Sequence, residues 1–277
     1  MKLLLTSMSA RKVWNIIKDR VNISEEEFYR MVRETLEKVP IINEEAAAIM
    51  VAERLGISAE EILFPPIIGR ILEIGPIRKT RSGAPYRVFT LVNEKELRTC
   101  VAFGEEHVSK LEELMERVVK ISRYILVRTP LGPLTRVTEA SQLEPLEDDV
   151  LPPVYKLEPA KCRSLEELKG IRGQRVVRGL VIIDQTTEIA VCPYCGSVVT
   201  LSEEGWSCSV HGTVEPEIRK VHRFQISDRS GMYPATYYGD VKDAKGKIIT
   251  FKGMFIGEEI HISKIYHIAD ITEFTTM

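Results

Sequence analysis

Two closely spaced ligand pairs between residues 191 and 212 constrain this chain more than any other feature of its sequence. They are Cys192-x-x-Cys195 and Cys208-x-x-His211, and they contain three of the five cysteines in the 277-residue chain. Two residues between ligands allow one short turn to direct both side chains at the same ion, and two such turns complete a tetrahedron. The spacing therefore predicts a zinc ribbon around one Zn²⁺ ion.

The predicted metal is structural rather than catalytic. Residues 198–201 are suited to a strand, and Gly205 and Trp206 to a turn and a returning strand, so a hairpin is expected between the two ligand pairs. Four protein ligands leave no position for a substrate or an activated water. A disulfide or an inert buried pair is the alternative for these cysteines. Cys100 and Cys162 have no partner pattern and are expected to be small apolar core residues.

Composition restricts the class of protein. A chain that is 44% hydrophobic and 28% charged can bury cores in two or three domains. No apolar run approaches membrane length, so we expect a cytoplasmic, intracellular protein with no membrane partner. Scarce Asn and Gln with plentiful Glu, Lys, Arg and Ile suit a thermophilic source. The net charge of −2 means that any nucleic acid must be bound through local patches rather than the overall field.

Residues 1–64 are predicted to form a helical domain. Val13, Ile16 and Ile17 recur at helical spacing, and Ser24 or Asn22 precedes a glutamate run as a helix start. The acids of this segment slightly outnumber its bases and no basic stripe runs along it. We therefore expect a plain bundle or a module that docks a protein partner, and not a nucleic-acid contact.

Residues 65–145 change to the two-residue alternation of β-strands. Five strands with one helix, from about His107 to Met115, between the third and the fourth are typical of an OB-fold, a small Greek-key barrel. The expected strands are 67–74, 86–92, 97–103, 118–127 and 134–143. An acidic, proline-containing linker is predicted over residues 146–163.

The second half repeats the first at an offset of 135 positions. The shift places Phe89 on Phe224, Leu91 on Ile226, Asn93 on Asp228, Phe103 on Tyr238, Gly104 on Gly239 and Glu105 on Asp240. Two unrelated hairpins with the same apolar alternation are the alternative, but a duplicated unit explains the shared ending better. Residues 164–277 are therefore predicted to form a second OB-fold barrel, with the zinc ribbon at 191–214 between its first two strands. Its expected strands are 174–190, 218–226, 232–238, 248–256 and 259–267. The expected fold class is mostly β with an α-helical N-terminal module.

The sequence resembles archaeal replication protein A over almost its whole length. The resemblance is carried by INEEAAAIMVAERLGI in the helical segment and by CPYC, CSVHG and HRFQISDRSG in the second OB-like segment. It implies a single-stranded DNA-binding protein of DNA replication, repair and recombination, associated with the nucleoid. It also implies that other replication protein A subunits, or replication and repair proteins, dock on the helical domain.

Candidate nucleic-acid contacts are cations and flat side chains near the loops that OB-folds use for ligands. In the first OB unit these are Arg78, Lys79 and Arg81 between the first two strands, Arg87 as a stacking guanidinium, and Arg128 and Arg136 at the last hairpin. In the second they are Arg219, His222, Arg223 and Tyr237. Tyr237 is expected on the surface and Tyr238 in the core, because Tyr238 matches Phe103, which is itself as suited to a core as to a binding face. A solvated charged surface is the alternative for each cation.

No phosphate-cradling glycine loop, zinc-protease motif or nucleophile elbow occurs in the sequence, so we expect a protein that is not an enzyme. Two other functions stay open. The chain is alternatively a replication-protein-A-like scaffold that binds protein partners, or an RNA-binding protein with OB-folds and a zinc ribbon. Stacking and phosphate contacts tolerate both sugars, so the sequence does not separate DNA from RNA.

Overall fold

Helices form the N-terminal part of the chain in the computed structural model, which describes residues 9–130, 132–203 and 205–271. They are α1 (Ala10–Ile17), α2 (Glu25–Lys38), α3 (Glu44–Arg54) and α4 (Ala59–Leu63). The side chains of Ser24, Asn43 and Ser58 accept a backbone N–H three residues later, which stabilises the first turns of α2, α3 and α4. Their apolar faces meet in a core that includes Val13 and Phe28. No helix in the described ranges is long and apolar enough to cross a membrane.

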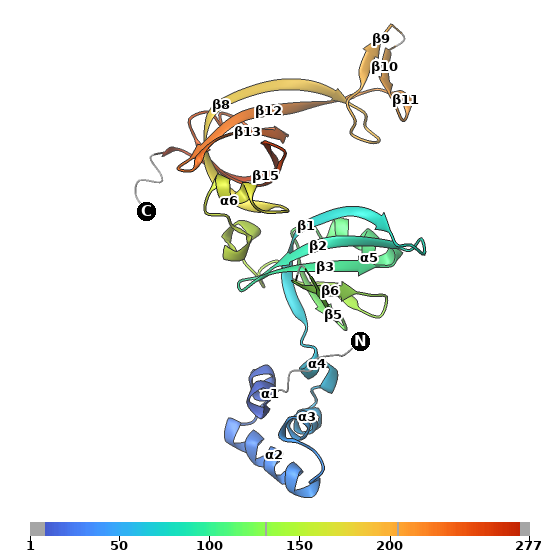
Figure 1. The fold of residues 1–277 in the computed structure, drawn as a ribbon, viewed down its shortest axis with the longest axis vertical. Coiled ribbons are helices and arrows are strands. Elements are labelled where there is room, and N and C mark those ends of the chain that lie inside the picture. Colours follow the sequence, from blue (N-terminus) through green and yellow to red (C-terminus); the bar gives the residue numbers. More distant parts are fainter. Residues whose placement is uncertain (1–8, 131, 204, 272–277) are drawn as a thin grey trace. The chain divides into compact units, whose positions relative to one another are not determined.

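The next segment forms a curled sheet in the order β5-β6-β3-β2-β1-β4-β7 (Figure 1). Its elements are β1 (Ile67–Lys79), β2 (Pro85–Val92), β3 (Leu97–Phe103), α5 (Glu105–Glu113), β4 (Val118–Ser122), β5 (Ile125–Thr129), β6 (Gly132–Val137) and β7 (Gln142–Pro145). β6 runs parallel to β3, whereas β7 pairs antiparallel with β4. β6, which lies next to the end strand β5, and β7, at the opposite end of the sheet, are consecutive in the chain, so their connection curls the sheet into a partly open barrel.

Two strands predicted as continuous are each broken in the structure. The expected strand 118–127 is β4 and β5, because Arg123 between them adopts a left-handed φ of 56°. The expected strand 134–143 is β6 and β7. The turn between them is held by Ser141, whose hydroxyl accepts the N–H of Thr138 and donates to the carbonyl of Arg123. The two breaks thus meet at one side chain.

The second barrel closes completely, in the order β12-β13-β15-β14-β8. Its strands are β8 (Arg175–Val191), β12 (Glu217–Asp228), β13 (Gly231–Tyr238), β14 (Ile248–Ile256) and β15 (Glu259–Ala269), and they lie close to the predicted ranges. Two short 3₁₀ turns, η1 (Val154–Lys156) and η2 (Glu158–Ala160), and α6 (Leu165–Lys169) precede them. β13 and β15 pair in parallel, as β3 and β6 do. Both sheets therefore have the strand order of an OB-fold, and the predicted fold class is confirmed.

The 135-residue offset holds at the level of individual positions. Phe89 and Phe224 are both buried in the core of their own barrel. Cys100 pairs with Thr135 in the first barrel, and Ala235, at the same offset from Cys100, pairs with Ile260 in the second. The repeat predicted from the sequence is therefore present in β3 and β13, whereas their parallel partner strands follow at an offset of 125 positions. Cys100 and Cys162 are both buried in barrel cores, as expected.

Candidate metal centre and nucleic-acid interface

A two-stranded arm carries the ligand pairs away from the second barrel. β8 and β12 stay paired from Leu180 opposite Ser227 to Val191 opposite Glu217, well past the barrel wall. At the end of the arm, β9 (Thr200–Ser202), β10 (Gly205–Cys208) and β11 (Gly212–Thr213) form a small antiparallel sheet (Figure 1). The hairpin predicted between the ligand pairs is β9 and β10.

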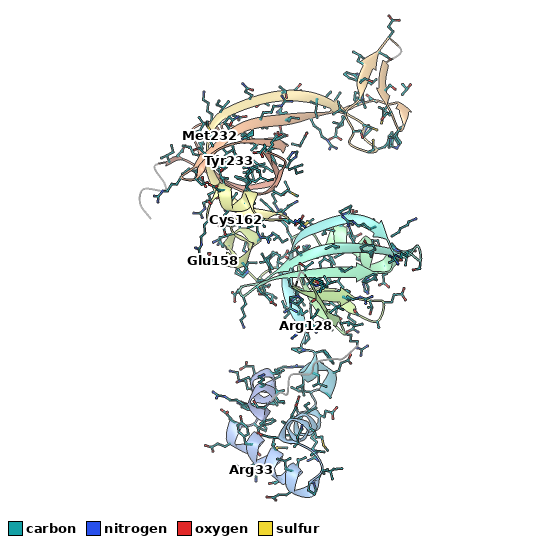
Figure 2. The ribbon with its side chains drawn as sticks, in the orientation of Figure 1. Arg33, Arg128, Glu158, Cys162, Met232 and Tyr233 are labelled. Atoms are coloured by element: carbon teal, nitrogen blue, oxygen red, sulfur yellow. The ribbon has the colours of Figure 1, made fainter. Side chains whose placement is uncertain are left out.

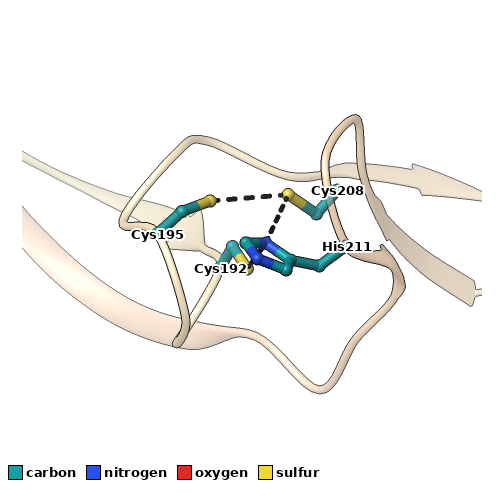
Figure 3. A group of neighbouring side chains, drawn as sticks. All are labelled: Cys192, Cys195, Cys208 and His211. Atoms are coloured by element: carbon teal, nitrogen blue, oxygen red, sulfur yellow. Dashed lines mark hydrogen bonds between the residues drawn. The ribbon is translucent and has the colours of Figure 1, made fainter. Parts of the chain in front are cut away.

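The four predicted ligands meet at one point (Figure 3). Their ligand atoms all lie within 4.8 Å of one another. The Sγ atoms of Cys195 and Cys208 are 3.6 Å apart, and His211 Nδ1 lies 3.5 Å from Cys192 Sγ and 3.7 Å from Cys208 Sγ. A tetrahedral ion with metal–sulfur bonds of ~2.3 Å spaces its ligands by about 3.8 Å. The separations match that edge, so these residues could bind one metal ion.

The surroundings of the cluster favour a closed metal site. Cys192 and Cys208 are buried in a small core with Ala190, Val199 and Val214, and Trp206 packs against it. Hydrogen bonds from the side chain and backbone of Ser197 lower the pKa of Cys195 to about 6, which favours the thiolate that binds metals. Three sulfurs and one imidazole nitrogen are a donor set that fits Zn²⁺.

The structure places the predicted contacts of the first barrel in three different settings. Arg78 and Lys79, at the end of β1, and Arg81, in the following turn, are exposed. Arg128 is exposed in β5 (Figure 2). The guanidinium carbon of Arg136 lies 4.8 Å from the centroid of the Phe103 ring. These cations are accessible, or partly accessible, to a ligand.

The prediction that Arg87 stacks on a base is wrong. Its side chain is buried, its Nε donates to the carbonyl of Gly75 at 2.7 Å, and its Nη2 donates to Glu112 at 2.9 Å. Arg87 has the same alternation phase as the core residue Phe89, so it points inward. The neighbouring Tyr86 has the opposite phase. Strand periodicity alone was enough to identify Tyr86, and not Arg87, as the outward-facing residue.

Tyr86 forms an aromatic pair that the sequence analysis missed. Its ring stacks on that of Phe103, with centroids 5.9 Å apart and ring planes at 27°. Both side chains are half-buried, and the guanidinium of Arg136 lies over the Phe103 ring. Two stacked rings and a guanidinium thus lie together on the outer side of β2, β3 and β6.

His222 is also misassigned as a nucleic-acid contact. Only 2% of its surface is exposed, and its Nδ1 lies 3.0 Å from Asp184 Oδ1 and 3.1 Å from Thr186 Oγ1. It shares the inward phase of Phe224, just as Arg87 shares that of Phe89. The offset of 135 relates these two buried polar residues, so both barrels bury a hydrogen-bonding side chain at this position of the second strand.

The expected roles of Tyr237 and Tyr238 are reversed in the structure. Tyr238 is 55% exposed, whereas Tyr237 packs against the core of the barrel. Tyr237 is paired with the inward-facing His222, and Tyr238 with Val221. Directly paired residues share a face of the sheet, so Tyr238 lies on the outer face together with Arg223.

A hollow of about 460 Å³ occupies that outer face. Its lining includes Arg223, Gln225, Thr236, Tyr238, Glu259 and His261. Arg223 is exposed and makes no ion pair with the described part of the chain. Arg219 is exposed too, but its Nη2 lies 2.8 Å from Glu217, which partly neutralises it. Of the predicted contacts in this barrel, Arg223 is the one placed beside an exposed ring.

The outer faces of the two barrels correspond at two positions. Val101 pairs with Arg136, and Thr236, at the same offset from Val101, pairs with His261. His261 therefore takes the place of Arg136, as Tyr238 takes that of Phe103. Each barrel presents an aromatic ring and a nitrogen-bearing side chain at equivalent sites.

Comparisons with known proteins give similarity in structure only. No family model matches the chain, and no curated protein matches it. Among solved structures, it is similar to a murine DNA-binding protein bound to double-stranded DNA, with 11% identity over 74% of this chain and 95% of the other and a TM-score of 0.32. It is also similar to a replication protein A heterotrimer bound to single-stranded DNA, with 14% identity over 77% of this chain and 67% of the other and a TM-score of 0.32.

A third similar structure is the OB domain of a Thermoplasma acidophilum protein, with 14% identity, 30% coverage of this chain and 76% of that one, and a TM-score of 0.25. The assignment of the fold rests on the strand order and register of the two barrels.

Proposed function

We propose that this protein binds single-stranded DNA along the outer faces of its two barrels, in the manner of replication protein A, and serves DNA replication, repair and recombination. The proposal is for a binding protein and not an enzyme. The observation that carries it is the correspondence of Phe103 and Arg136 with Tyr238 and His261. Two copies of one surface on one chain suit a repetitive ligand better than a single small molecule.

The chemistry of both faces suits a single strand. Bases stack on aromatic rings whatever their identity, at ~1–3 kcal/mol for each base, and cations alongside hold the phosphates. The exposed ring of Tyr238 and the half-buried rings of Tyr86 and Phe103 offer flat surfaces of the kind that stacking needs. Arg78, Lys79 and Arg81 add positive charge at the end of the first face.

The metal in this proposal is one Zn²⁺ with a structural role. Cys192, Cys195, Cys208 and His211 use all four tetrahedral positions, so the ion would fold the ribbon and offer no place for chemistry.

The helical segment up to residue 64 is proposed as a separate domain that docks a protein partner, because it has its own apolar core.

Fluorescence anisotropy of the zinc-loaded chain with oligo-dT, oligo-U and duplex DNA, each at two salt concentrations, tests the proposal. Oligo-dT is expected to bind most tightly, and more weakly at the higher salt. A preference for oligo-U would instead indicate an RNA-binding protein. Failure to bind any of the three would contradict the proposal and favour a protein-binding scaffold.

A further inference from the structure

One carboxylate lies inside the proposed interface of the second barrel. Glu259 is the first residue of β15, and its side chain lines the outer hollow with Arg223 and His261. The side chain is half-buried, and its Oε1 accepts a hydrogen bond from the hydroxyl of Thr236. The carboxylate is therefore held in the hollow by a neighbouring strand and is not a freely moving surface acid.

An acid at this place opposes the binding of phosphates. Two negative charges a few ångströms apart repel each other, so Glu259 weakens any path that brings the backbone of a strand close to it. Among the residues that the structure describes, no cation forms an ion pair with Glu259. A carboxylate has acceptor sites on both oxygens, and the Thr236 hydroxyl supplies one donor. The side chain is thus suited to a ligand that brings further donors.

The bases of a single strand are such ligands, because their Watson–Crick edges are free. Guanine presents two adjacent donors there, N1–H and N2–H₂, which match the two oxygens of a carboxylate. Thymine presents one N–H between two carbonyl acceptors. Cytosine and adenine each present an amino group beside a ring-nitrogen acceptor, which faces the second carboxylate oxygen unfavourably. Guanine is therefore the base that a carboxylate accommodates best.

We infer that the hollow of the second barrel selects guanine, with Glu259 accepting hydrogen bonds from its Watson–Crick edge. The inference rests on the proposed function. A volume of about 460 Å³ lies in the range of ligand pockets and admits a base. Arg223 in the same hollow offers the donors that match guanine O6 and N7, and Tyr238 offers a ring on which the base stacks. Single strands rich in guanine are then the ligands that this barrel prefers.

The test compares three oligonucleotides of equal length, oligo-dT, a d(TG) repeat and a d(TC) repeat, bound to the full zinc-loaded chain at one salt concentration. The d(TG) repeat is expected to bind about fivefold or more tightly than the other two, the lower end of what one bidentate base contact provides. Glu259→Gln removes one of the two acceptors. This variant should lose the preference for d(TG), while its affinity for oligo-dT should stay the same or rise, because the negative charge that opposes phosphates is removed.

Glu258→Gln is the matched control. Glu258 is the neighbouring carboxylate, and it pairs with Lys169 at 2.7 Å outside the hollow. This variant should keep the preference for d(TG). Equal binding of all three oligonucleotides by the parent chain, or an unchanged preference in Glu259→Gln, would overturn the inference and leave the proposed function standing. Binding to none of them would overturn both.

Discussion

The two barrels share one strand register and differ in what they place on it. In the first, Tyr86 and Phe103 form a stacked pair, and the guanidinium of Arg136 lies over the Phe103 ring. In the second barrel, Val221 occupies the position equivalent to Tyr86, so Tyr238 has no second ring beside it on the outer face. A hollow lined by Arg223 and Glu259 opens next to Tyr238 instead. The interior positions stay matched while the outer face varies, because the core fixes the fold and the surface does not.

The connection between the first two strands differs even more. The first barrel has a tight turn at residues 80–84, beside Arg78 and Lys79. The second barrel has the metal ribbon at this place, and no lysine or arginine occurs between residues 191 and 217. Positive charge at this connection therefore belongs to the first barrel. We expect the first barrel to hold phosphates more strongly and the second to discriminate between bases.

The largest expected difference concerns the metal. Cys208→Ser should abolish stoichiometric zinc and unfold the ribbon, because structural zinc contributes ~10 kcal/mol or more to the folding of such units. Elemental analysis and hydrogen exchange of residues 191–216 measure the two effects. Cys162→Ala removes a cysteine outside the cluster and should leave the zinc in place. A Cys208→Ser chain that kept its metal would show that the ribbon assignment is wrong.

The next effect tests whether the two cores are equivalent. Phe89 and Phe224 occupy the same position in the repeat and are almost fully buried, at 1% and 2% exposure. Phe89→Ala and Phe224→Ala should each lower the free energy of unfolding of its own barrel by ~3–5 kcal/mol. Hydrogen exchange resolved by barrel distinguishes the two. A loss below ~1 kcal/mol for one variant would break the correspondence between the barrels.

The next smaller effect is the contribution of ring stacking in each barrel to the free energy of DNA binding. Phe103→Ala and Tyr238→Ala are each expected to cost ~1–3 kcal/mol of oligo-dT binding and to leave the salt slope unchanged, because stacking releases no counterions. On oligo-dT, which offers no guanine to Arg223, Arg223→Ala should instead reduce the salt slope by about 0.7, the value for one phosphate contact on a single strand. Tyr237→Phe keeps the inward-packed ring and serves as the control. A salt slope that changed in Tyr238→Ala would contradict the assigned roles.

The smallest effect is the contribution of Asp228 to the pH dependence of the stability of the second barrel. Burial acts to raise the pKa of Asp228, but hydrogen bonds from Ser230 and from the N–H groups of Leu165 and Gly231 outweigh it and lower the pKa. The carboxylate therefore stabilises the folded state above the unfolded pKa near ~4, and this stability is lost as the pH falls through the lower folded value. Asn93, its uncharged counterpart, accepts the N–H of Glu96 at 3.0 Å in the first barrel.

Asp228→Asn should remove that pH dependence and cost ~1–2 kcal/mol at neutral pH. Thermal unfolding of parent and variant between pH 3 and pH 7 measures it. Curves that stayed parallel over this range would refute the role of the ionised carboxylate.

The sequence predicted the parts of the fold that repeat a pattern. β14 was placed at its observed bounds, Ile248–Ile256, because apolar alternation continues up to Gly257. The four metal ligands followed from spacing alone. The break at Arg123 could not be predicted, because a left-handed φ at a residue other than glycine has no sequence signal. Ile125 and Leu126, which follow Arg123, are exposed on the edge strand β5, although apolar residues of this kind are typical of a buried strand.

The outward-facing tyrosine was misassigned by one residue because side chains alternate with period two, whereas Arg219 and Arg223 are exposed as predicted. The turn after Asp228 pairs it directly with Gly231, and this register puts Tyr237 opposite His222. Without the turn geometry, nothing in the sequence decides which of two adjacent tyrosines faces outward. Arg87 and His222 were predicted as contacts from their chemistry, although their phase matched the core. Periodicity was the better guide at both positions.

The most direct test of the two-barrel account is the affinity of the Phe103→Ala/Tyr238→Ala double variant for an oligo-dT of about 30 nucleotides, long enough to span two OB-folds. Because the two rings lie on separate barrels, their losses should add, giving a total of ~2–6 kcal/mol relative to the parent chain. A double variant that bound no more weakly than one of the single variants would show that one barrel alone contacts the strand, and would contradict the account.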